Sequence, residues 1–294
     1  MKLLSALCLS ANFMGANAFS AIPPGPPEPP APHLMPTPSE PASALSPAGD
    51  FEIFPEYDSL ETLESGGTVR TYAMPTWATR VQYRLETNGR PMKGEVNLWL
   101  GPERKTHTLK VDSENGKEFP VQVLLKFKPT PVLKVSTTTL ANYPMKVGVH
   151  VPSPERAKEL EMHTEDVWDN LIDEEEKKLI QGANTDGKYG KRVNWIIPEN
   201  VDSIQLLGWN RDSGRKSFKV EIELLHGPNN VRQYYFLQCG GGSQPYHAVF
   251  QTPGSGWVVR IRNKKFVEDG LIHIAVKPYR TSEPKPDQAL LNWN

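Results

Sequence analysis

The chain has little cysteine, no charge imbalance and no long apolar run, and each of these absences excludes a class of protein. Only two of its 294 residues are cysteine, Cys8 and Cys239, so a disulfide-stapled fold is excluded. The net charge of −1 gives no electrostatic reason to expect nucleic acid or an anionic membrane as a partner. After the N-terminus, no apolar stretch approaches the roughly 20 residues that a membrane-spanning helix needs.

The sequence also lacks the usual groupings of catalytic and metal-binding residues. Its seven histidines show neither HxxxH nor HxH spacing, and no G-x-S-x-G motif occurs. Cys239 has no obvious paired base, which favours a buried thiol. Gly240-Gly241-Gly242 lacks the Lys-Ser/Thr of a phosphate loop and is interpreted as a hairpin turn, and Glu174-Glu175-Glu176 as a solvated helix face. We therefore expect no cofactor, no metal and no enzymatic activity.

What the chain does contain is a tandem repeat. Residues 95–102 (EVNLWLGP) return 126 positions later as residues 221–228 (EIELLHGP). Residues 71–75 correspond to 194–198 at an offset of 123, and residues 132–135 to 258–261 at 126. Gly89-Arg90 similarly corresponds to Gly214-Arg215. Four matches in the same order indicate a duplicated module, which favours a building block or a binding protein over an enzyme.

Short runs that alternate between apolar and polar residues predict β-strands in both copies. These runs are residues 81–85, 96–100 and 147–151 in the first copy, and 204–207, 218–225, 234–237, 257–261 and 272–276 in the second. Glycine and proline punctuate them at intervals too short for βαβ crossovers. We predict an all-β fold of two tandem, pseudo-symmetric antiparallel β-sandwich repeats, residues 66–152 and 183–279.

A single helix is predicted between the copies, as a helical linker over residues 153–182. Ser153 can cap it, with Pro154 in the first turn, and Gly182 can end it. Apolar residues recur at helical spacing, namely Val167, Trp168, Leu171, Ile172, Leu179 and Ile180. This apolar stripe is expected to pack on a sandwich or to meet a neighbouring molecule.

The N-terminal 50 residues are predicted to be targeting sequence. Residues 1–18 combine Lys2, an apolar run and the A-x-A pattern at 16–18, as a signal peptide does. Phe19 follows directly, and residues 19–50 are rich in proline and poor in acids. This arrangement resembles the bipartite plastid-targeting presequence of diatoms and related algae. Removal of the signal would leave Cys239 as the single cysteine.

Three further features leave alternatives open. Residues 51–65 mix acids with apolar residues, which fits either a disordered arm or an arm that docks on a partner. The tail, residues 280–294, carries Leu290, Leu291 and Trp293, which we interpret as a candidate self-assembly contact. Tryptophans in the repeats fit core positions better than stacking platforms for a sugar; they are Trp77, Trp99, Trp195, Trp209 and Trp257.

Together these features resemble the pyrenoid shell proteins of diatoms. Each copy has a Gly-Arg turn followed by a strand that ends in Gly-Pro (89–102 and 214–228), behind a diatom-type presequence. The resemblance covers about residues 66–279. It implies a chloroplast protein at the pyrenoid periphery, one that self-assembles into a sheet-like shell around the Rubisco-containing pyrenoid and supports carbon concentration and fixation.

The resemblance also implies partners, and two other functions stay open beside it. The implied partner is the protein itself, with Rubisco or the pyrenoid matrix as further candidates and no catalytic residues to carry over. One alternative is a carbohydrate- or small-ligand-binding β-sandwich module. The other is a hydrolase or lyase whose active residues are scattered along the sequence.

Overall fold

The computed structural model describes residues 51–57, 59–102, 104–128, 130–169, 177–180 (backbone only), 192–210, 217–240, 244–265 and 272–282. These residues all belong to one unit of the chain, Ala42–Asn294. The predicted signal peptide, the proline-rich segment and the contact at Leu290, Leu291 and Trp293 lie outside the described residues.

The described strands form two antiparallel sheets of eight strands each. Sheet A has the order β1-β8-β3-β6-β14-β11-β16-β9, and sheet B has the order β10-β15-β12-β13-β5-β4-β7-β2. The bounds are β1 Glu61–Leu63, β2 Val69–Ala73, β3 Arg80–Glu86, β4 Met92–Leu100, β5 Arg104–Ser113, β6 Val121–Lys126, β7 Val132–Thr137, β8 Met145–His150, β9 Lys177–Ile180, β10 Arg192–Ile196, β11 Val201–Trp209, β12 Phe218–His226, β13 Val231–Cys239, β14 Tyr246–Gln251, β15 Trp257–Asn263 and β16 Ile272–Thr281.

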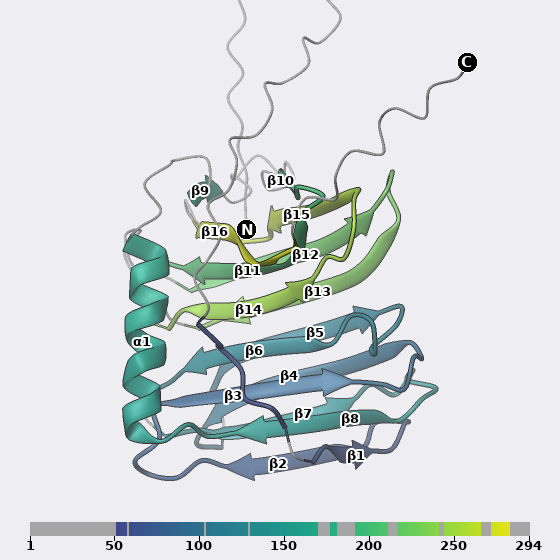
Figure 1. Ribbon diagram of the computed structural model, residues 1–294. Helices are drawn as coiled ribbons and strands as arrows, with labels where there is room; N and C mark the ends of the chain where they lie inside the picture. The colour runs from purple at the N-terminus through teal and green to yellow at the C-terminus, as the bar shows by residue number, and fades with distance from the viewer. Residues whose placement is uncertain are drawn as a thin grey trace, which may run out of the picture. The chain divides into compact units, whose positions relative to one another are not determined.

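Both sheets are shared equally between the two repeats. In each sheet, four neighbouring strands come from the first half of the chain and four from the second, in mirrored order. The halves meet where β6 pairs with β14 in sheet A and where β5 pairs with β13 in sheet B (Figure 1). We call these two junctions the seam. The predicted all-β fold of two pseudo-symmetric antiparallel repeats is confirmed, and the structure adds that both sheets run on across the seam.

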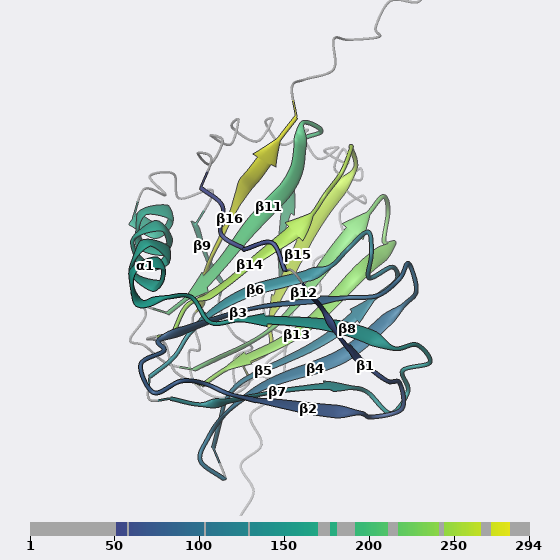
Figure 2. The same ribbon diagram turned by 60° about the horizontal axis from the view of Figure 1, so that its bottom comes forward.

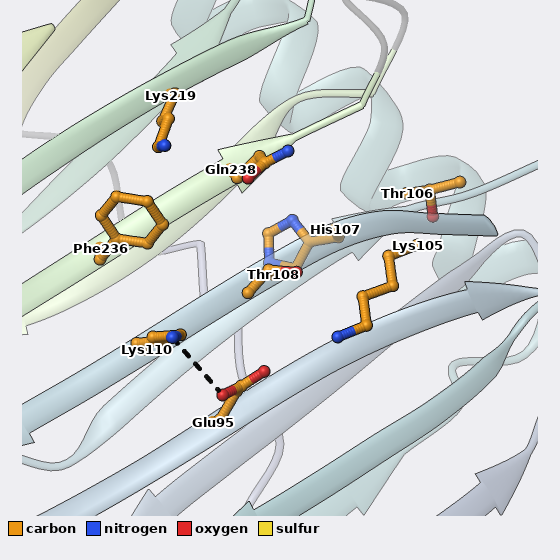
Figure 3. Close-up of a pocket in the computed structure, with 9 residues that line it drawn as sticks. All are labelled: Glu95, Lys105, Thr106, His107, Thr108, Lys110, Lys219, Phe236 and Gln238. Carbon is orange, nitrogen blue, oxygen red and sulfur yellow. Dashed lines mark ion pairs between the residues drawn. The ribbon is translucent and has the colours of Figure 1, made fainter. Parts of the chain in front are cut away.

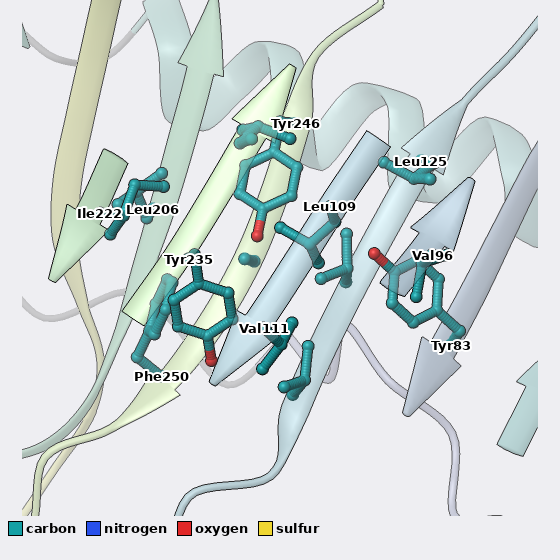
Figure 4. Close-up of a cluster of buried hydrophobic side chains, with 14 of the residues drawn as sticks. Tyr83, Val96, Leu109, Val111, Leu125, Leu206, Ile222, Tyr235, Tyr246 and Phe250 are labelled. Atoms are coloured by element: carbon teal, nitrogen blue, oxygen red, sulfur yellow. The ribbon is translucent and has the colours of Figure 1, made fainter. Parts of the chain in front are cut away.

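One hydrophobic core lies between the sheets and crosses the seam. Alternate residues of each strand point inward, as Leu109 and Val111 do on β5 and Leu237 does on β13. Figure 4 shows side chains of both repeats meeting in this core, with Tyr246 beside Leu109. Because the apolar surface of each half is buried partly against the other half, the hydrophobic contribution to folding is shared by both.

Helix α1, Pro154–Asp169, covers part of the outer face of sheet A (Figure 2). The hydroxyl of Ser153 accepts a hydrogen bond from the Arg156 backbone N–H at 3.2 Å, so the predicted cap is confirmed. The predicted extension of the helix to Gly182 is wrong at residues 177–180. These residues form strand β9, whose Ile180 pairs with Ile272 at the edge of sheet A, and this backbone pairing replaces the helical one.

Two other expectations are corrected. The Gly240-Gly241-Gly242 segment does not connect a hairpin, because β13 before it belongs to sheet B and β14 after it belongs to sheet A. The segment 51–65 is not a free arm where it is described, because it packs on the chain itself. Its Ile53 and Phe54 are buried against the chain's own Leu160 and Leu124, and its residues 61–63 form β1.

Candidate functional site

A polar depression of about 300 Å³ lies on the outer face of sheet B, directly at the seam. Both repeats line it, through strands β4 and β5 from one side and β12 and β13 from the other (Figure 3). The lining residues are Glu95, Lys105, Thr106, His107, Thr108, Lys110, Lys219, Phe236 and Gln238.

The strand register explains why these side chains gather. Lys110 lies opposite Phe236 across the seam, and Thr108 lies opposite Gln238. In each strand these residues alternate with core residues such as Leu109 and Leu237, so they point outward. The depression therefore requires the pairing of β5 with β13 and is incomplete within either repeat alone.

The depression carries an excess of positive charge. Lys110 lies 4.0 Å from the Glu95 carboxylate, at the limit of an ion pair. The Lys105 ammonium lies 4.8 Å from the centroid of the Trp99 ring, and the Lys219 ammonium lies 5.1 Å from that of Phe236. An aromatic face attracts a cation without cancelling its charge. Three ammonium groups against one carboxylate thus give a surface suited to an anionic partner.

A buried thiol–imidazole pair lies on the core side of the same junction. His107 Nδ1 is 3.1 Å from Cys239 Sγ, and the two residues are direct partners between β5 and β13. Burial lowers the pKa of His107 to about 3 and raises the pKa of the Cys239 thiol well above its ordinary range. Both groups are therefore neutral near pH 7, which is the opposite of the thiolate–imidazolium state of a nucleophilic cysteine. The expectation of a buried thiol is confirmed.

Three tyrosines extend this buried polar cluster: Tyr83 and Tyr235 are fully buried, as is Tyr246, whose ring stacks on His107. Burial raises the pKa of each phenol, so all three stay protonated. The Tyr83 and Tyr246 hydroxyls have no hydrogen-bond partner among the described residues. The cluster is neutral and enclosed, and it offers no charged group to a substrate.

On the outer face of sheet A, helix α1 and the segment 51–57 cover the other side of the seam. His247 of β14 lies between them, with Nε2 3.0 Å from the side-chain Oε1 of Gln205 and Nδ1 3.3 Å from the Thr164 hydroxyl. The His163 ring lies between the rings of Phe51 and His247. Burial lowers the pKa of His247 to about 3 and also lowers the pKa of His163.

The structure places the tryptophans mainly in the interior. Trp195, Trp209 and Trp257 are buried, Trp99 is partly buried, and Trp77 is 52% exposed. A row of exposed, coplanar tryptophans, as a sugar platform requires, is not present in the described part of the chain. Those same residues contain no group of three or more side chains placed to hold a metal ion.

Sequence reasoning missed both the depression and the thiol–imidazole pair. His107 and Cys239 are 132 positions apart, and Lys105 and Lys219 come from different repeats. The one usable signal was the repeat itself, because equivalent strands of a duplicated module often pair across a pseudo-two-fold axis.

No described helix is long and apolar enough to cross a membrane.

Comparisons with known proteins show the family of this chain but do not establish its fold. No curated protein matches the chain by sequence.

Among solved structures, an uncharacterized protein from Burkholderia cenocepacia is 9% identical, with 63% of this chain and 76% of that chain covered and a TM-score of 0.21. An oxalate decarboxylase mutant from Bacillus subtilis is 8% identical, over 76% of this chain and 68% of that chain, with a TM-score of 0.17. The oxalate decarboxylase of Lactobacillus farciminis is 10% identical, over 76% and 85%, with a TM-score of 0.15. Likenesses this low do not establish a shared fold.

The family comparison is decisive by contrast. The model of the diatom pyrenoid shell protein family matches residues 57–278, which include both repeats and the helix between them. The chain therefore belongs to the diatom pyrenoid shell protein family, which places it in the plastid with a structural role at the pyrenoid.

Proposed function

We propose that this protein is a non-enzymatic building block that assembles with copies of itself into a sheet-like shell around the Rubisco-containing pyrenoid. Such a shell would support the concentration and fixation of CO2. The observation that carries the proposal is the family match over residues 57–278. Targeting by the N-terminal presequence is part of the same proposal, as is contact with Rubisco or other matrix components.

The strand order supports self-assembly. Sheet B begins with β10 and ends with β2, and these edge strands have no further strand partner among the described residues. Neighbours are antiparallel throughout, so in a sheet of eight strands the first and last run in opposite directions. A second copy in the same orientation can therefore add its β10 to β2 as another antiparallel pair. Because such a contact joins two different edges, it need not close and can extend indefinitely.

The C-terminal tail is a second proposed contact. Leu290, Leu291 and Trp293 follow a polar, proline-bearing segment that begins soon after β16. Burial of these apolar side chains in a pocket on a neighbouring copy would stabilise the assembly. This contact is independent of the sheet edges and can be removed without touching a described strand.

Electron microscopy of the purified full chain tests the proposal. We expect extended sheets or tubes to form above a threshold concentration. Deletion of residues 283–294 should raise that threshold, and Lys117→Glu, an exposed change in a turn, should leave it unchanged. Particles that remain monomeric at all concentrations would overturn the proposed function. Sheets that form equally well without the tail would overturn only the role of the tail.

A further inference from the structure

We propose that the basic depression on sheet B receives the acidic outer face of helix α1 from a second copy of the chain. The inference rests on the proposed self-assembly and names one of its contacts. The core lies between the sheets, α1 covers the outer face of sheet A, and the depression opens on the outer face of sheet B. The two surfaces therefore lie on opposite faces of one molecule.

The outer face of α1 is acidic around one exposed apolar residue. Its buried side is formed by Ala157, Leu160, Thr164, Val167 and Trp168. Glu155, Glu159, Met162 and Glu165 are exposed, at spacings of three and four residues that place them along one side of the helix. Lys158 is exposed on the same side, and Glu159 forms an ion pair with Arg156 at 2.6 Å, so the three glutamates leave this face with a small acidic excess. Met162 is 62% exposed, which is unusual for a large apolar side chain on a helix that is otherwise packed.

The depression complements this face in charge and in composition. Lys105 and Lys219 have no carboxylate within ion-pair distance among the described residues, and both are held over aromatic rings. On the neighbouring strand β15, by contrast, Arg260 and Arg262 are paired with Glu223 and Glu221. Lys105 and Lys219 are therefore available to an anionic partner in a way that these arginines are not. Phe236 beside Lys219 offers an aromatic surface to Met162, a favourable pairing for a thioether.

Contact between opposite faces of identical molecules repeats without closing. It runs across the sheets, whereas the β2–β10 contact runs along them. Two open contacts in different directions are what a two-dimensional array requires. The depression also exists only when the two repeats are joined at the seam. Each chain therefore presents one basic depression and one helix α1.

A charge-swap experiment on the full chain tests this contact. Variant one carries Lys105→Glu and Lys219→Glu, and variant two carries Glu159→Lys and Glu165→Lys. We expect each alone to raise the assembly threshold, measured by sedimentation, at least about tenfold, equivalent to about 1.4 kcal/mol per contact. An equimolar mixture of the two should assemble again, because each acidic helix then meets a basic depression and each basic helix an acidic one. The control, Lys117→Glu with Lys128→Glu, changes exposed lysines outside the depression and should match the wild type.

The outcomes separate this inference from the proposed function. If wild-type protein assembles and variant one assembles equally well, the inference is wrong and the shell function stands. If only variant one is impaired, the depression receives an anion from elsewhere, which overturns the helix as its occupant. If circular dichroism shows that both variants are folded and their mixture still does not assemble, the proposed contact between helix α1 and the depression is also overturned. Wild-type protein that never assembles contradicts the proposed function itself.

Discussion

At the scale of single residues, burial holds His107 and His247 in their neutral forms. Their pKa values of about 3 lie well below the ordinary value of 6.5. Between these two values the unfolded chain binds protons that the folded chain does not. The stabilisation is therefore present above pH 6.5 and is lost as the pH falls through this window. At pH 5, each of these two histidines lowers the free energy of unfolding by about 2 kcal/mol relative to its value above pH 6.5.

We accordingly expect that stability falls between pH 7.5 and pH 5 and that His247→Gln makes this fall smaller. Glutamine cannot take up the proton, so the difference in the free energy of unfolding between the two pH values should shrink by about 2 kcal/mol. Urea unfolding at both pH values measures it. His150→Gln is the matched control, because His150 is exposed at the end of β8. An equal effect of both substitutions would contradict the conclusion that the burial of His247 in its neutral form causes this pH dependence.

At the scale of elements, helix α1 holds the two repeats together from outside. Leu160 is fully buried against Leu124 of β6 and Val249 of β14, which are strands from different repeats. Glu161, the next residue of the helix, forms ion pairs with Lys126 of β6 and Arg80 of β3. Burial alone would raise the pKa of Glu161, but the hydrogen bonds from these cations lower it. The helix thus bridges the seam by packing, and its ion pairs attach it to the first repeat.

Leu160→Ala should lower the free energy of unfolding by about 3 kcal/mol, since it leaves a cavity between the helix and both repeats. Lys158→Ala changes an exposed residue of the same helix and should stay within about 0.5 kcal/mol of the wild type. Chemical denaturation followed by circular dichroism compares the two. A small loss for Leu160→Ala would mean that α1 lies on the sheet without stabilising it.

Covering both faces of a strand can remove the alternation that predicts it, as a comparison of β12 with β14 shows. Strand β12 alternates strictly between buried and partly exposed residues over its first seven positions, and it was predicted. Strand β14 has no such alternation, because five of its six residues are buried, between the core on one side and α1 on the other. It was missed for that reason. Strand β9 was read as helix because its apolar pair, Leu179 and Ile180, continues the helical spacing of Val167 and Trp168.

At the scale of the whole molecule, the repeat was the one sequence signal that bore on the pairing across the seam, and it did not specify that pairing. The repeat predicted two similar sandwiches, and nothing in it stated that β5 would pair with β13 or β6 with β14. Such pairs join residues more than 100 positions apart, and their register follows from the burial of both halves against each other. The basic depression, which depends on that register, could not have been predicted either.

The shared sheets and core predict that the two repeats unfold together. Separating them would expose the paired edges of β5 and β13 and open the core at Leu109 and Tyr246, so neither half retains a closed interior. We expect Leu109→Ala, in the first repeat, to speed hydrogen exchange in β12 of the second repeat as much as in β4, and unfolding to remain a single transition. Exchange measured by mass spectrometry resolves the two strands. Faster exchange confined to β4 would show that the repeats are independent units, and the depression at the seam would then be a contact between domains.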